Sequence, residues 1–237
     1  MSVYLSNVIN MMFEQHITLD GLGIGTLIAL PKPKKPIGPL ASLHPIVLLN
    51  CTGKVISLIT LHRIQKKVNR FTNTTQAGFK QGRSCSDIVW AQRMLIAVVQ
   101  CRQWKFYKMG IDMSLALDTI KRAKILKILA IAGCNEDELC LTQALLANTQ
   151  LTVRVKNTHS ASFETTIGSP QGDSLSPVLF TCYLEVALCE VRSNTSWLNR
   201  PISNSRMPFE WGYADDVDFA NEEQPPLSSG THSRSGT

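Results

Sequence analysis

Hydrophobic positions recur at helical spacing in several long stretches and at strand spacing in shorter ones. Helical spacing predicts helices over residues 53–69, 86–100, 119–132 and 136–148, and in the stretch that begins at Pro177. Short apolar or alternating runs predict strands over residues 26–30, 151–155 and 163–167, the last two as a hairpin. Because helical and strand patterns are segregated, the sequence predicts an α+β fold, an antiparallel sheet with helices against one face.

The pattern over residues 53–69 also predicts which side of that helix is buried. Val55, Leu58 and Ile59 fall on one helical face, whereas Arg63 and Lys66 belong to a more polar and basic face. We therefore expect the three apolar side chains to pack against the core and the basic ones to face water.

Two adjacent carboxylates interrupt the apolar run of residues 209–220. Asp215 and Asp216 would repel each other if both were desolvated, so a strand–turn–strand that presents them at its tip is best explained by a divalent cation. Asp112 also follows a short apolar run and would supply a third carboxylate. Taken alone, Asp112 would be interpreted as a strand-end cap or turn residue. Together, the three carboxylates favour a metal site.

Composition narrows the class of protein. The 237 residues fit one large domain or two smaller ones, and the net charge of +6 favours a polyanionic partner, although a merely basic surface would give the same charge. The seven cysteines form no Cys-x-x-Cys pair and have no zinc-site spacing with the five histidines, which is typical of buried free thiols in a reducing compartment. No secretion signal and no run of about 18 apolar residues is present. We therefore expect an intracellular protein, in the nucleus or cytoplasm, that does not enter a membrane.

Three segments occur in an informative order. Residues 112–118 read Asp-Met-Ser-Leu-Ala-Leu-Asp, residues 168–177 read Gly-Ser-Pro-Gln-Gly-Asp-Ser-Leu-Ser-Pro, and residues 213–216 read Tyr-Ala-Asp-Asp. They resemble the palm motifs of reverse transcriptases, most closely the non-LTR (LINE-type) retrotransposon enzymes. There the motifs read Asp-Phe-Ser-Lys-Ala-Phe-Asp, Gly-x-Pro-Gln-Gly-x-x-Leu-Ser-Pro and Tyr/Phe-Ala-Asp-Asp. A lone Tyr-Ala-Asp-Asp would be weak evidence, but several ordered matches are strong evidence.

The resemblance implies a right-hand polymerase fold from which the thumb is absent, so the chain looks like a truncated fragment with fingers and part of the palm. Because the family continues past Tyr-Ala-Asp-Asp, the missing thumb region or another chain would be needed for full activity. The implied domains are the fingers at 1–105, the palm strand with the first carboxylate at 106–121, helices and a hairpin on the fingers side at 122–160, the palm at 161–220 and a disordered tail at 221–237.

The resemblance also implies a reaction, RNA-directed DNA polymerisation. Two Mg²⁺ ions about 3.5–4 Å apart, or Mn²⁺ in their place, would be held by Asp112, Asp215 and Asp216, with the backbone carbonyl of Met113 as a further ligand. One ion would lower the pKa of the primer 3′-hydroxyl and the other would neutralise triphosphate charge. The implied partners are an RNA template, a DNA primer and dNTPs.

Two basic positions in the fingers are implied to meet the nucleotide. Lys32 lies in a Pro-Lys run after the predicted strand at 26–30, a position near template and incoming nucleotide in the family, although such a run is also typical of a solvated loop. His44 stands where family members usually have arginine. Histidine is mostly neutral near pH 7 and offers fewer hydrogen bonds than a guanidinium, so nucleotide binding is expected to weaken.

Three further positions are implied to contact the nucleotide from the palm. Gln171 and Gly172 lie in the Pro-Gln-Gly segment, which faces template base and incoming nucleotide in the family; glycine permits close approach, and an amide both donates and accepts. Leu117 occupies the position of a phenylalanine or tyrosine whose ring blocks a ribose 2′-hydroxyl. Asp118, next along, is interpreted as an N-cap of the following helix.

A basic loop before the helix at 86–100 is implied to follow the template strand. Residues 76–87 resemble the family segment Gln-x-Gly-Phe-Arg-x-Gly-Arg-Ser, which places Lys80, Arg83 and Ser84 on a glycine-bearing loop that would approach phosphates. A basic turn with a helix cap is the alternative.

Two other functions remain open. An RNA-directed RNA polymerase would share the palm carboxylates, but those enzymes usually have Gly-Asp-Asp in place of the Ala-Asp-Asp found here. A non-catalytic retroelement relic that binds nucleic acid is the other alternative, and the substitutions at His44 and Leu117 favour it.

Overall fold

The computed structural model describes residues 2–15, 21–36, 39–113, 115–147, 149–194 and 208–222. The helices are α1 Ser2–Gln15, α2 Cys51–Phe71, α3 Cys85–Arg102, α4 Arg122–Ile131, α5 Glu136–Leu146 and α6 Ser176–Asn194. The strands are β1 Ile24–Pro31, β2 Leu43–Leu49, β3 Phe106–Asp112, β4 Thr149–Val155, β5 Thr158–His159, β6 Phe163–Thr165, β7 Glu210–Tyr213 and β8 Asp216–Glu222. Within these ranges, no helix has the length and apolar character needed to span a membrane.

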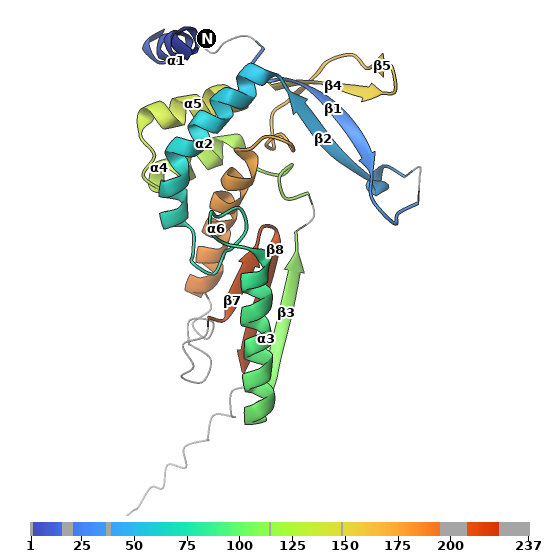
Figure 1. The fold of residues 1–237 in the computed structure, drawn as a ribbon, viewed down its shortest axis with the longest axis vertical. Helices are drawn as coiled ribbons and strands as arrows, with labels where there is room; N and C mark the ends of the chain where they lie inside the picture. The colour runs from blue at the N-terminus through green and yellow to red at the C-terminus, as the bar shows by residue number, and fades with distance from the viewer. Residues whose placement is uncertain are drawn as a thin grey trace, which may run out of the picture.

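The strands form two separate sheets. One has five strands, in the order β2-β1-β4-β5 with β6 also paired to β4, and the other has three, in the order β3-β8-β7. In Figure 1 the first sheet projects to one side of the helices, and the second lies below them beside α3. The predicted hairpin is present, with β4 paired antiparallel to both β5 and β6. The antiparallel sheet predicted for the palm is confirmed, because β3, β8 and β7 are all paired antiparallel. In the five-stranded sheet, β1 and β4 run parallel, a pairing that the sequence did not indicate.

The larger hydrophobic core joins the helices to one face of the three-stranded sheet. Side chains from α2, α4, α5 and α6 pack together, and Val217 and Phe219 of β8 belong to the same buried cluster. A smaller cluster lies on the opposite face, where Leu95 of α3 packs near Trp211 of β7 and Ala220 of β8. Burial of alternate strand residues on opposite faces therefore places this sheet between α6 and α3.

The helices begin where the sequence supplies caps. The Asn50 side chain accepts a hydrogen bond from Gly53 N at the start of α2, and capping boxes begin α3 at Ser84 and α5 at Asn135. Each cap satisfies backbone N–H groups that have no partner within the helix.

One predicted helix face and one boundary differ from the sequence prediction. In α2 the buried side chains include Ile56, Thr60 and Ile64, whereas Val55 and Leu58 are exposed. The helix packs against α5 and α6, and the position of these two partners selects the buried face. At the other end of the chain, β8 runs to Glu222, into the stretch predicted as a tail. The rest of that stretch lies outside the described residues.

Candidate active site

The three-stranded sheet brings the predicted carboxylates to one end. Asp112 is the last residue of β3 and is the cross-strand partner of Asp216, the first residue of β8. Asp215 lies in the two-residue turn between β7 and β8, next to Ala214, whose φ is +58°. Residues directly opposite each other in an antiparallel pair have Cα atoms about 4.5–5.5 Å apart. Residues about a hundred positions apart in the sequence therefore lie next to each other at this end of the sheet.

Electrostatic repulsion marks this end of the sheet. The pKa of Asp216 is raised, first by desolvation and then by the negative charges of Asp215, Asp112 and Asp218. Asp218 itself is neutralised in part, because it forms an ion pair with Lys108 (3.1 Å) and accepts a hydrogen bond from Gln92. This pairing accounts for Asp218 as a structural residue of the sheet. The other three carboxylates form no such ion pair among the described residues.

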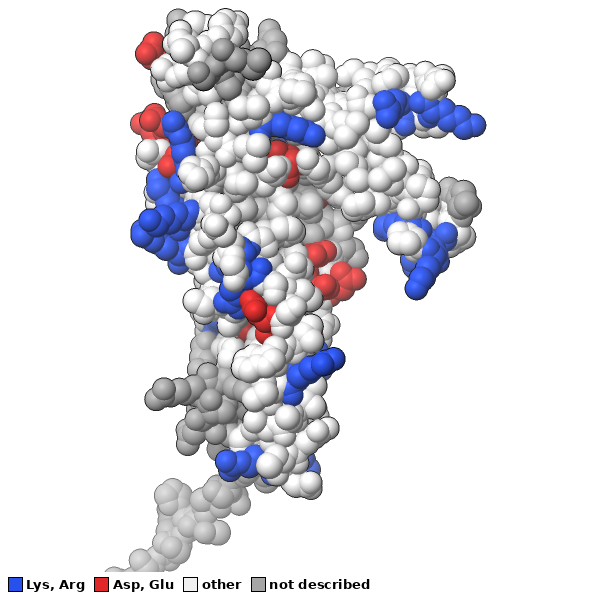
Figure 2. Space-filling model, viewed as in Figure 1, with Lys and Arg blue, Asp and Glu red and all other residues white. Residues whose placement is uncertain are grey.

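A cavity of about 390 Å³ opens beside the carboxylates. It extends from the end of β3 and the β7–β8 turn to the hairpin of β1 and β2. In Figure 2 acidic side chains gather on one side of a hollow and lysine or arginine side chains on the projecting hairpin across it. The predicted site residues that line the cavity are Lys32, His44, Asp112, Met113, Leu117, Gln171 and Asp215. The structure thus brings together residues that the sequence separates by up to 183 positions (215 − 32).

Two of the residues predicted to bind metal or nucleotide do not line this cavity. Asp216 lies on β8, beside the lining residue Asp215. Gly172 packs against β2 instead, where a Cβ atom would stand 2.7 Å from the carbonyl oxygen of Val47, and its φ is +111°. The neighbouring Gln171 carbonyl accepts a hydrogen bond from Val47 N (2.6 Å). Glycine is therefore required at 172 for the segment to reach β2, and this contact fixes the Gln171 backbone at the cavity wall.

Asp118 was not recognised in the sequence as part of the site. The N-cap of α4 is Lys121, so the prediction that Asp118 caps this helix was wrong. Asp118 lines the cavity and accepts hydrogen bonds from Gln171 Nε2 at both carboxylate oxygens (3.1 and 3.0 Å). Because both bonds use the side-chain nitrogen, the side-chain oxygen of Gln171, Oε1, is left to accept a hydrogen bond from a ligand. No local signal in the sequence shows this pairing, which joins residues 53 positions apart.

The predicted template residues are all bonded to their own loop. Lys80 Nζ donates to the carbonyl oxygens of Thr72 and Asn73, and burial lowers the pKa of this lysine. Arg83 forms an ion pair with Asp87 (3.0 Å), and Ser84 is the N-cap of α3. The structure therefore shows a structural use for each residue, and their contact with a template stays a prediction.

Donor chemistry at the carboxylate end suits a hard cation, although the described side chains do not form a ready-made cage. Within the described residues, no group of three or more histidine, cysteine, aspartate or glutamate side chains is arranged to hold a metal ion. The available donors are carboxylate oxygens with a backbone carbonyl nearby, the ligand type that Mg²⁺ prefers. The residues present thus fit a divalent cation in chemistry, and ligation requires the side chains to turn toward it.

Comparison with solved structures shows the same fold in telomerases. Telomerase from Candida tropicalis in complex with the TWJ fragment of telomeric RNA has a TM-score of 0.60 at 11% identity, covering 94% of this chain and 40% of that one. Telomerase from Candida albicans in the corresponding complex has a TM-score of 0.55 at 11% identity, covering 86% and 37%. The apo Candida tropicalis enzyme without its C-terminal domain has a TM-score of 0.57 at 9% identity, covering 94% and 49%. The chain thus spans less than half of each.

Family membership rests on a match of the sequence itself. Residues 30–228 match the family described as reverse transcriptase (RNA-dependent DNA polymerase), and this span includes every residue assigned above to the cavity. The fold shared with telomerase is consistent with that match. The chain belongs to the reverse transcriptase (RNA-dependent DNA polymerase) family.

Proposed function

We propose that this chain is the fingers and palm portion of an RNA-directed DNA polymerase from a non-LTR, LINE-type retroelement. The observation that carries the proposal is the shared cavity, in which Asp112 and Asp215 lie on one side and Lys32 and His44 on the other. Cations held by the carboxylates and the charge of Lys32 would both meet the negative triphosphate of a nucleotide bound in this cavity. An RNA template, a DNA primer and dNTPs are the proposed partners, and the nucleus or cytoplasm the proposed location.

Asp112, Asp215 and Asp216 would hold divalent cations, Mg²⁺ or Mn²⁺. When bound, these ions would make the primer hydroxyl more acidic and neutralise phosphate charge. The carboxylates themselves act by position: a strand end and a tight turn fix their backbones, so only the side chains would have to reorient when the ligands arrive.

The other cavity residues would bind and orient the nucleotide. Lys32 would offer a positive charge to the phosphates, and the His44 ring would contribute one or two hydrogen bonds. The side-chain oxygen of Gln171, Oε1, would accept a hydrogen bond from a sugar or base, because the side-chain nitrogen already donates to Asp118. Leu117, which is half-buried in the cavity wall, would face the sugar and leave room for a 2′-hydroxyl.

Extension of a DNA primer on an RNA template tests this proposal. In the presence of Mg²⁺ the natural chain alone should add dNTPs slowly or not at all, whereas addition supported by a supplied thumb region or partner chain should be abolished by Asp215→Asn. Asp137→Asn is the matched control, because this carboxylate lies in the first turn of α5 and does not line the cavity. Equal supported extension by the natural chain and Asp215→Asn would contradict the proposal.

A non-catalytic relic that binds nucleic acid is the second candidate. It is favoured by the residues at positions 44 and 117, each of which weakens an expected nucleotide contact. Binding of an RNA–DNA hybrid without extension, unchanged in Asp215→Asn, would support the relic. Preferential addition of ribonucleotides to an RNA primer would instead support the less favoured RNA-directed RNA polymerase.

A further inference from the structure

The loop between α2 and α3 extends the three-stranded sheet at the turn that carries Asp215. Gly212 of β7 donates its N–H to the Thr75 carbonyl oxygen (3.1 Å) and accepts from Ala77 N (2.8 Å). These two bonds pair Gln76 with Gly212 as a parallel bridge. A short stretch of the loop thus lies along β7 and reaches the β7–β8 turn, although 136 positions (212 − 76) separate the paired residues.

The Gln76 side chain forms hydrogen bonds with both backbone groups of the first turn residue. Its Oε1 accepts from Ala214 N (3.0 Å), and its Nε2 donates to the Ala214 carbonyl oxygen (3.2 Å). The same Oε1 also accepts from Gly78 N (2.8 Å). Gln76 is only 4% exposed, so water does not compete for these groups. A primary amide is suited to this task, since it carries a donor and an acceptor on the same planar group.

The turn needs such support for two reasons. Ala214 has a φ of +58°, a left-handed conformation that a residue with a Cβ atom adopts at a cost. In addition, two adjacent carboxylates of like charge, Asp215 and Asp216, follow directly in the sequence. Without a partner, the Ala214 backbone would be free to relax, and the position of the Asp215 side chain would change with it.

Two glycines make room for this contact. A Cβ atom at Gly212 would stand 2.8 Å from Gln76 Nε2, and one at Gly78 would stand 2.2 Å from Ala214 N. Both distances are shorter than a carbon atom tolerates. Glycine on both sides of the amide therefore permits the loop and the turn to approach closely.

We propose that Gln76, on the loop before α3, is a positioning residue that fixes the β7–β8 turn and thereby sets where the Asp215 carboxylate stands in the nucleotide cavity. Its catalytic consequence rests on the proposed function, in which Asp215 serves nucleotide addition. Its structural consequence, a turn fixed through the Ala214 backbone, does not. The two are tested separately.

Amide hydrogen exchange in the full chain, without metal or nucleotide, tests the structural consequence. In the described structure the acceptor of Ala214 N is Gln76 Oε1. Gln76→Leu keeps the approximate size of the side chain and should lower protection of this amide by about tenfold or more, as expected for loss of a buried hydrogen bond. Thr142→Val is the matched control, because it removes a hydrogen bond of a fully buried side chain in α5, remote from the turn. Unchanged protection at Ala214 in folded Gln76→Leu would overturn the proposal.

Gln76→Glu provides a second test that does not depend on folding of the leucine variant. An ionised glutamate has no donor for the Ala214 carbonyl oxygen, whereas a protonated one has. Burial raises the pKa of such a carboxyl group. Protection of Ala214, corrected for intrinsic exchange, should therefore increase in Gln76→Glu as pH falls from about 7 to about 5, a window set by that raised pKa. A protection ratio to the natural chain that stays constant over this window would contradict the donor role of Gln76.

Steady-state nucleotide addition tests the catalytic consequence. Gln76→Leu should lower kcat by about tenfold or more, since small displacements of a catalytic group are costly, while the KM for dNTP stays within about twofold. Thr142→Val should leave both values unchanged. If the natural chain adds no nucleotides even with a supplied thumb region or partner chain, the proposed function fails and the exchange experiments alone decide the role of Gln76. If it does add them, an unchanged kcat in Gln76→Leu would overturn the positioning role.

Discussion

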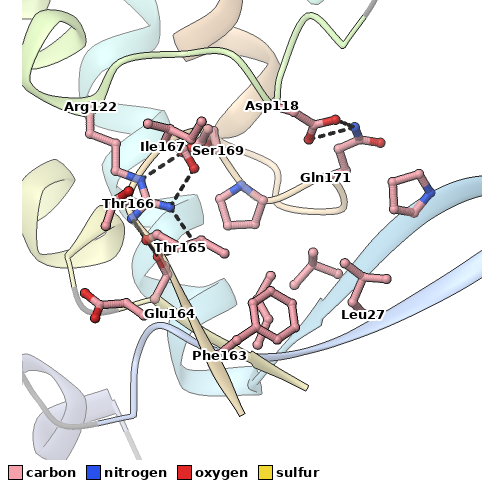
Figure 3. A pocket seen from close by; sticks show the side chains of 16 residues that line it. Leu27, Asp118, Arg122, Phe163, Glu164, Thr165, Thr166, Ile167, Ser169 and Gln171 are labelled. Carbon is pink, nitrogen blue, oxygen red and sulfur yellow. Dashed lines mark hydrogen bonds between the residues drawn. The ribbon is translucent and has the colours of Figure 1, made fainter. Parts of the chain in front are cut away.

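Two neighbouring cavities of this molecule use charged side chains in opposite ways. The cavity with Asp112 and Asp215 has a volume of about 390 Å³, and a larger one of about 470 Å³ lies on the other side of a wall formed by Pro45, Asp118 and Gln171. Figure 3 shows the larger cavity, with the Asp118–Gln171 pair on one side and Arg122 on the other. Size alone would favour the larger cavity as a binding site.

The bonds of Arg122 explain why size is misleading here. Its Nε donates to the Gly168 carbonyl oxygen (2.9 Å), and its Nη1 donates to carbonyl oxygens of Leu146 and Thr165 (2.8 and 2.6 Å). Its Nη2 donates to Thr165 Oγ1 and to the Ile167 carbonyl oxygen (3.0 and 3.2 Å). Burial lowers the pKa of this guanidinium, and the charge of Glu164 opposes the shift.

The charge of Arg122 has a structural role, whereas the arrangement of the Asp112 and Asp215 charges indicates a function. Arg122 holds α4 to the strands β4 and β6 and has its nitrogens engaged by protein oxygens. Among the described residues, the carboxylates of Asp112 and Asp215 form no ion pair, and both residues line a cavity. Groups of one charge kept together without partners are destabilising, so their retention at this site favours a function.

The largest effect should follow from neutralising an unpartnered carboxylate. Asp112→Asn should lower primer extension by about 10³-fold, because it removes a charge placed for catalysis. Its free energy of unfolding should not fall, since repulsion with Asp216 on the paired strand is relieved. Activity is measured by single-nucleotide addition and stability by urea unfolding. Asp87→Asn, which loses an exposed ion pair with Arg83, is the control. A similar loss of activity in both variants would contradict a catalytic role specific to the Asp112 carboxylate.

Replacing Arg122, whose guanidinium is hydrogen-bonded to protein oxygens, should instead lower the free energy of unfolding. Arg122→Met keeps most of the side chain's apolar volume but leaves several carbonyl oxygens without a donor, so the free energy of unfolding should fall by about 2–4 kcal/mol. Arg93→Met, at an exposed position on α3, should change it by less than about 0.5 kcal/mol. Urea unfolding of both variants provides the measurement. A ligand-binding role for Arg122 would become the better interpretation if the two variants were equally stable.

A third prediction concerns the shape of the smaller cavity. Leu117→Phe should increase discrimination against ribonucleotides by about tenfold, because the aromatic ring fills the space that a 2′-hydroxyl would occupy. The measurement compares kcat/KM for dNTP and for rNTP. Leu115→Phe is the control, since Leu115 lines the same cavity but is 67% exposed. Equal ribonucleotide exclusion by the natural chain and Leu117→Phe would contradict the assignment of Leu117 to the sugar.

The smallest effect should come from Asp216 itself. Its folded-state pKa is raised above the ordinary value of 3.8, so the folded chain holds this proton more tightly than the unfolded chain does. The resulting stabilisation is present at low pH and is lost as pH rises from about the ordinary value through the raised one. Asp216→Asn should therefore raise the free energy of unfolding at pH 7 by about 0.2–1 kcal/mol, the usual cost of like charges directly opposite on paired strands.

Unfolding of Asp216→Asn and Asp137→Asn across this pH range gives the test. The second substitution should have the opposite sign, because Asp137 lies in the first turn of α5, where negative charge is favourable. Destabilisation by Asp216→Asn at pH 7 would show that this carboxylate has a partner of its own.

The sequence by itself determined the features that depend on neighbours along the chain. The period of apolar residues located α2 to α6, and polar residues such as Asn50, Ser84 and Asn135 mark three of their starts, because a cap acts within a single turn. The motifs around Asp112, Gln171 and Asp215 indicated one site, and these residues line one cavity.

Only the tertiary structure decided which distant groups meet. The parallel pairing of β1 with β4 joins Ile24 to Gln150, and no local pattern encodes that choice. The buried face of α2 was selected by α5 and α6, so Ile56 is fully buried and Val55 is exposed. Asp118 bonds to Gln171 where its position before a helix suggested a cap.

Gln76 shows most directly why contacts between distant residues could not be predicted from the sequence. As a residue in a loop, it resembles many solvent-facing glutamines, and its importance comes from the two backbone groups of Ala214 that the fold brings within 3.0 and 3.2 Å. A hydrogen bond between remote residues depends on where two separate elements are packed, which is set by the burial of the whole core. That burial involves the whole chain. Periodicity and motifs therefore located the helices, strands and candidate site residues, whereas packing determined which distant residues contact each other.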